Sequence, residues 1–99
     1  MTEEIIRLLT EGNVREAERY VARMVLELSE GVASGTVIPL AADAYVSRLW
    51  IRIGEQFPHV KLDENVEQLM IEGMSFHDYG TKFGPDFGLI RAYAKQVLA

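Results

Sequence analysis

The hydrophobic positions of this chain recur at helical spacing over most of its length. The longest such stripe consists of Val14, Ala17, Tyr20, Val21, Met24, Val25, Leu28 and Val32. Charged side chains occupy the opposite face, so the pattern predicts an amphipathic helix from Asn13 to about Gly31. Within that helix, Glu16 is placed to pair with Arg19 and Arg23.

A shorter helix is expected before it, with apolar contacts from Ile5, Ile6, Leu8 and Leu9. Thr2 suits the N-cap of this first helix, and Gly12 is expected to end it. Asn13 then caps the next helix, and Glu16 three residues on can complete a capping box.

The turn between these two helices has a familiar sequence. The segment Gly12-Asn13-Val14-Arg15-Glu16-Ala17 resembles the inter-helix turn of a tetratricopeptide repeat. The resemblance covers one helical hairpin, and the chain holds no second copy, whereas three or more copies are normally needed for a stable stack. It therefore implies a hairpin and no repeat array.

A third helix, from Pro39 to about Phe57, carries two apolar faces. The broad face consists of Ala42, Val46, Leu49, Trp50, Ile53 and Phe57, and the second of Leu40, Ala44 and Ile51. Two apolar faces indicate a central helix or an oligomer interface, so we expect this helix in the middle of the domain and a homodimer as the assembly. On its polar strip, Arg52 is expected to pair with Glu55.

Two further helices complete the prediction. One begins at Asp63 and Glu64 and carries Val66, Leu69, Met70, Gly73 and Met74; the last follows Pro85 and carries Phe87, Ile90, Tyr93, Ala94, Val97 and Leu98. No strand-like alternation competes with these periods. We therefore predict an all-α single domain over residues 1–99, a bundle of four or five helices with a Gly/aromatic-rich connection before the last helix, which packs across the third.

That connection is the most regular segment of the chain. Between His77 and Gly88 an aromatic residue precedes a glycine every four positions, in the pairs Tyr79-Gly80, Phe83-Gly84 and Phe87-Gly88. Glycine permits close approach and each aromatic ring is a large anchor, so the segment suits either a partner-binding site or a corner packed against the core. In the second case Phe83 and Phe87 bracket the turn.

Composition and charge exclude several classes of function. The chain has no cysteine and a net charge of -5, which disfavours redox chemistry and phosphate-backbone binding. No apolar run approaches the length of about 20 residues that a membrane span needs, and the acidic start is unlike a secretory signal, so a cytoplasmic protein is expected. The acids Asp63, Glu64, Glu67 and Glu72 cluster in one stretch and would suit a basic protein partner.

Candidate chemistry is sparse. His77, Asp78 and Tyr79 are adjacent and could move protons if a substrate lay between them, in a cleft between the fourth and last helices. A metal site would need both histidines, His59 and His77, without the short spacing of known zinc motifs, and Gly80 and Gly84 match no nucleotide-binding loop. No metal or cofactor is expected.

These observations favour a noncatalytic protein-interaction module, such as a small adaptor, regulator or inhibitor. Its predicted contact residues are Tyr79, Phe83, Phe87, Glu67 and Glu72. The alternative is a small-molecule-binding protein or an enzyme with a weak sequence signal, whose cleft would contain His77 and Asp78.

Overall fold

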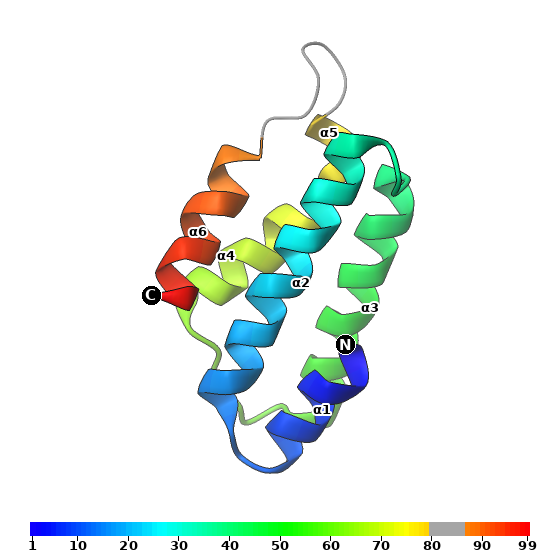
Figure 1. Ribbon diagram of the computed structural model, residues 1–99. Coiled ribbons are helices and arrows are strands. Elements are labelled where there is room, and N and C mark those ends of the chain that lie inside the picture. The colour runs from blue at the N-terminus through cyan, green and yellow to red at the C-terminus, as the bar shows by residue number, and fades with distance from the viewer. Residues whose placement is uncertain (80–86) are drawn as a thin grey trace.

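Six helices make up the part of the chain that the computed structural model describes, residues 1–79 and 87–99 (Figure 1). They are α1 (Thr2–Thr10), α2 (Val14–Ser34), α3 (Pro39–Gln56), α4 (Glu64–Gly73), α5 (Phe76–Tyr79) and α6 (Gly88–Leu98). The described residues contain no strand, and the prediction of one all-α globule is confirmed. The sequence pattern missed α5, because a single turn is too short to establish a period.

The α1–α2 hairpin forms as predicted, although its caps differ. Gly12 has a φ of +79° in the turn, a conformation that glycine adopts at little cost. Thr2 lies inside α1, whose N-cap is Met1, and the Thr2 hydroxyl lies 2.8 Å from the hydroxyl of Tyr45 on α3. The prediction of Thr2 as an N-cap is therefore wrong.

At the start of α2, Asn13 occupies the N-cap position but its side chain makes no capping hydrogen bond. The expected capping box is absent, because the Glu16 carboxylate forms ion pairs with the guanidinium groups of Arg19, at 3.4 Å, and Arg23, at 3.9 Å. That pair of ion contacts confirms the prediction for Glu16. The helix continues to Ser34, three residues beyond its expected end, and stops at Gly35, which has a φ of +80°.

The centre of the bundle is α2, which packs against α1, α3, α4 and α6. Figure 1 shows α3 on one side of α2 and α6 on the other, with α6 packed on α2 and α4. The expectation that α3 would be central, with the last helix packed across it, is therefore wrong. A second apolar face on a helix does not reveal whether that face is covered, and here the described chain covers only one face of α3.

The buried faces of α4 and α6 confirm the stripes read from the sequence. The fully buried side chains there include Val66, Leu69, Met70, Ile90, Ala94 and Val97. The Asp63 carboxylate accepts a hydrogen bond of 2.9 Å from the backbone N–H of Asn65, which confirms the predicted cap of α4. At the other end of α4, a Cβ on Gly73 would lie 3.3 Å from methyl carbons of Val25 and Val46, so this glycine permits close packing of α4 on α2 and α3.

The start of α6 is anchored by an aromatic pair. Phe87 is only 2% exposed, and its ring meets that of Phe76 edge to face, with centroids 5.5 Å apart. Phe87 thus occupies the packed-corner position rather than a surface open to a partner. Phe83, Gly80 and Gly84 fall outside the described residues, as does the side chain of Tyr79.

Candidate functional site

A buried carboxylate joins α3 to the start of α5. Asp43 is 7% exposed, and its Oδ1 accepts a hydrogen bond of 2.5 Å from the backbone N–H of Phe76. Its Oδ2 accepts a weaker one, 3.2 Å long, from the backbone N–H of His77. Because the first N–H groups of a helix lack intrahelical partners, Asp43 serves as the N-terminal cap of α5 from a different helix.

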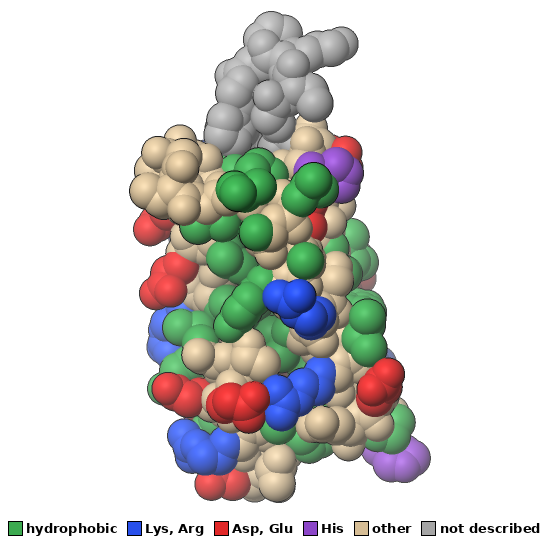
Figure 2. Space-filling model, turned by 90° about the vertical axis from the view of Figure 1, so that its right-hand side faces the viewer, with side chains coloured by type: hydrophobic (Ala, Val, Ile, Leu, Met, Phe, Trp, Pro, Cys, Tyr) green, Lys and Arg blue, Asp and Glu red, His purple; other side chains and the backbone are tan. Residues whose placement is uncertain are grey.

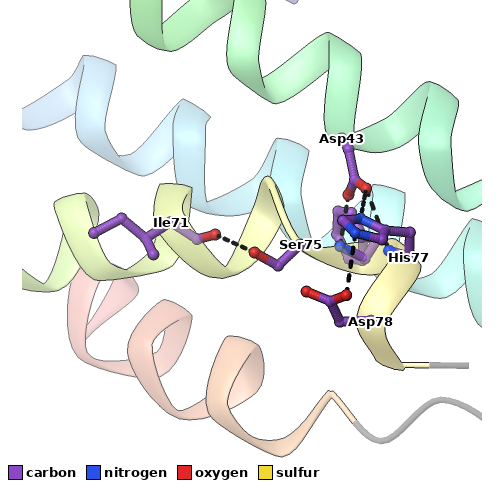
Figure 3. A network of polar contacts seen from close by, with 6 residues as sticks. Asp43, Ile71, Ser75, His77 and Asp78 are labelled. Atoms are coloured by element: carbon purple, nitrogen blue, oxygen red, sulfur yellow. Dashed lines mark hydrogen bonds and ion pairs between the residues drawn. The ribbon is translucent and has the colours of Figure 1, made fainter. Parts of the chain in front are cut away.

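The imidazole of His77 lies between two carboxylates (Figure 3). Its Nδ1 is 2.6 Å from Oδ2 of Asp43, and its Nε2 is 3.1 Å from Oδ1 of Asp78. The hydrogen bond to Asp43 raises the pKa of His77 and the negative charges of Asp78 and Asp43 raise it further, whereas desolvation opposes them. The protonated ring can donate to both carboxylates at once, so this cluster favours the imidazolium form.

The contacts of this cluster join α3 to α5. Both ring nitrogens of His77 already face carboxylates of the same chain, which leaves neither nitrogen open toward a substrate. The sequence pattern singles out His77 and Asp78 but not Asp43. A signal existed: Asp43 lies directly after the core residue Ala42 and three residues before the core residue Val46, a position that places a carboxylate beside an apolar face.

The uncovered side of α3 carries exposed apolar side chains. Leu40 is 65% exposed and Ile51 is 55% exposed, and Ala44 between them is exposed as well. These three side chains form the α3 outer face, the second apolar face seen in the sequence. Figure 2 views the molecule from the α3 side and shows hydrophobic side chains scattered along it with Lys or Arg side chains between them.

Two charged residues lie beside this face. Arg48 and Glu55 are both exposed on α3, and neither forms an ion pair within residues 1–79 and 87–99. The predicted partner of Glu55 is engaged elsewhere: the Arg52 guanidinium binds the Glu3 carboxylate on α1, at 2.7 Å for Nη1 to Oε1. The predicted Arg52–Glu55 pair is therefore wrong. The Arg52 guanidinium instead donates two hydrogen bonds to the Glu3 carboxylate, the second from Nη2 to Oε2 at 3.3 Å.

A cavity of about 290 Å³ lies at the C-terminal end of α3, beside the connection 57–63 and α4. Its lining includes Trp50, Phe57, Leu62 and Met70, and the only carboxylate among the lining residues belongs to Glu67. The start of α4 is fixed next to this cavity by a buried side chain of α2, because Oε2 of Glu18 accepts a hydrogen bond of 2.6 Å from the backbone N–H of Asp63.

Those predicted contact residues whose side chains the structure describes lie in different surroundings. Glu67 lies at the cavity, Glu72 is half-buried on α4, and Phe87 is in the core. Tyr79 contributes its backbone to α5. In the described ranges these residues do not assemble into one site.

Comparison with known proteins adds no assignment. No known protein family matches the chain, and neither a curated protein nor a solved structure matches it. None of the described helices is both long and apolar enough to cross a membrane. Across residues 1–79 and 87–99, no group of three or more His, Cys, Asp or Glu side chains is arranged to hold a metal ion.

Proposed function

We propose that the protein is a noncatalytic protein-interaction module and that its contact surface is the α3 outer face. The observation that carries this proposal is the exposure of Leu40 and Ile51 on one helix face. Isolated exposed apolar residues are ordinary, but an apolar stripe along a helix is typical of surfaces that bind another chain. Covering such a stripe contributes roughly 25 cal/mol per Å² of apolar area removed from water.

The partner that suits this face is a second copy of the chain. Arg48 and Glu55 are seven residues apart, or about 10 Å along the helix, on the same flank of the face. If two copies of α3 pack antiparallel about a two-fold axis near Ile51, Arg48 of each copy lies opposite Glu55 of the other, and Leu40 lies opposite the connection that follows α3 in the other copy. The arrangement supplies both residues with the ion pairs that they lack within the described chain and brings the two Ile51 side chains together.

The test is the oligomeric state of matched variants, measured by analytical ultracentrifugation or native mass spectrometry. The wild type is expected to be a dimer, and Ile51→Asp a monomer, because two carboxylates would be buried against each other. Leu89→Asp is the control, since Leu89 on α6 is 54% exposed, close to the exposure of Ile51. Equal effects of the two substitutions, or a wild type that stays monomeric at high concentration, would overturn the proposal.

Charge reversal tests the orientation. Arg48→Glu and Glu55→Arg should each weaken the dimer, because each places like charges opposite one another twice. The double variant should restore it. Failure of the double variant to restore a dimer that both single variants weaken would contradict the antiparallel arrangement.

The alternative of a ligand cleft at His77 and Asp78 has less support. The imidazole is held by Asp43 and Asp78, and its contacts explain its position without a ligand.

A further inference from the structure

The cavity at the C-terminal end of α3 has an apolar lining and one acid. Trp50, Phe57 and Met70 supply aromatic and aliphatic surface, and Glu67 supplies the carboxylate. Ligand sites commonly combine apolar walls with a few polar groups that fix the orientation of the ligand. The polar group of this lining therefore indicates what the cavity would accept.

The Glu67 carboxylate has no counter-charge in the described chain. Glu67 is half-buried on α4, and no cation and no hydrogen-bond donor within residues 1–79 and 87–99 pairs with its side chain. Lys61, which lies exposed in the adjacent connection, forms no ion pair with it there. A carboxylate beside apolar surface is stabilised by an opposite charge, so an incoming cation would gain a charge-assisted hydrogen bond.

We propose that this cavity binds a small organic cation, an apolar group that carries a protonated amine. The apolar part lies against Trp50 and Phe57, where an aromatic face also attracts a cation, and the ammonium group donates to Glu67. The cavity volume of about 290 Å³ is at the lower limit for ligand sites, which suits a short alkyl chain or a single ring. The negative charge of Glu67 would repel an anion, and a neutral ligand would leave that charge without a partner.

Trp50 makes the proposal directly measurable, because it is the only tryptophan in the chain and it lines the cavity. The probe is n-hexylamine at neutral pH, with 1-hexanol and hexanoate as matched neutral and anionic compounds, and the readout is Trp50 fluorescence. Hexylamine should give a saturable change at a concentration at least about tenfold lower than hexanol, a factor that corresponds to about 1.4 kcal/mol. Hexanoate should bind more weakly than either.

Variants separate the site from general acidity. Glu67→Gln should abolish the preference for hexylamine over hexanol, whereas Glu64→Gln, which removes an exposed acid one turn earlier on α4, should preserve it. Gly54→Leu should block both compounds, because Gly54 lines the cavity and a Cβ there meets no atom within 4 Å. Circular dichroism confirms that each variant is folded.

Three results would overturn the proposal: no saturable change with hexylamine, equal binding of hexylamine and hexanol, or equal effects of Glu67→Gln and Glu64→Gln. The proposal does not rest on dimer formation. Ile51→Asp, which disrupts the α3 outer face, should therefore still prefer hexylamine to hexanol, so that failure of the dimer and failure of the cavity site can be told apart.

Discussion

At the scale of single residues, Asp43 is the acid that joins α3 to α5. It is nearly buried, and it accepts hydrogen bonds from two backbone N–H groups while it also contacts an imidazole. Buried carboxylates are tolerated when such partners replace water. Its position on α3 and its partners on α5 make it the link between two helices that are separated in sequence by α4.

His77 should make stability depend on pH. Its pKa is raised in the folded protein, chiefly by the hydrogen bond to Asp43, above the unfolded value of about 6.5. The stabilisation is therefore fully present below about pH 6.5 and is lost as the pH rises through the higher, folded pKa. Thermal unfolding between pH 6 and pH 9 should show this decline in the wild type and a smaller one in His77→Gln.

His59→Gln is the matched control for that series, because His59 is exposed in the connection after α3 and should leave the decline in place. An NMR titration of the wild type provides the direct check. A His77 midpoint at or below the value of an unfolded peptide would contradict the contact with Asp43.

At the scale of elements, substitution of a glycine in α3 and of one in α4 should change the free energy of unfolding in opposite directions. A Cβ at Gly73 would crowd the side chains of Val25 and Val46. Alanine also has a higher helix propensity than glycine, which offsets part of this cost, so Gly73→Ala should destabilise the fold by about 1–2 kcal/mol in total. Gly54→Ala meets no neighbour and should stabilise the fold by up to about 1 kcal/mol. Chemical denaturation measures both, and destabilisation by Gly54→Ala would show a packing constraint at that position.

The helices themselves were predictable because each long one keeps a regular apolar stripe. Local signals also located the Gly12 turn, Pro39 in the first turn of α3 and the Asp63 cap of α4. These features depend on neighbours in the sequence, so the sequence pattern is sufficient to find them. The predicted end of α2 at Gly31 is too early, because Gly31 is tolerated inside the helix and Gly35 is the residue that ends it.

The arrangement of the elements was less predictable, since it depends on contacts between distant residues. The apolar stripe that includes Ile51 has the same period whether another helix covers it or solvent does. Arg52 forms an ion pair with Glu3 on α1, although Glu55 lies nearer to it in the sequence. Asp43 and Glu18 likewise contact backbone groups 33 and 45 residues away, which no local pattern marks.

At the scale of the whole molecule, self-association should be visible in thermal unfolding. The chain carries a net charge of -5, but one cation and one anion, Arg48 and Glu55, flank the α3 outer face. The two copies of the proposed dimer would therefore meet at a surface whose flanking charges balance. Because a dimer is stabilised by mass action, the unfolding midpoint of the wild type should rise with protein concentration. The midpoint of Ile51→Asp should not, and a concentration-independent wild type would argue against the dimer.

The position of α6 has a consequence for how the protein is made. The helix covers α2 and α4, although its residues follow α2 by more than fifty positions. During synthesis the α1–α2 hairpin can form early from local contacts, but the apolar sides of α2 and α4 stay open until residues 88–98 have emerged from the ribosome. Nascent chains that stall before that point would expose the apolar sides of α2 and α4, and chaperones should bind these chains.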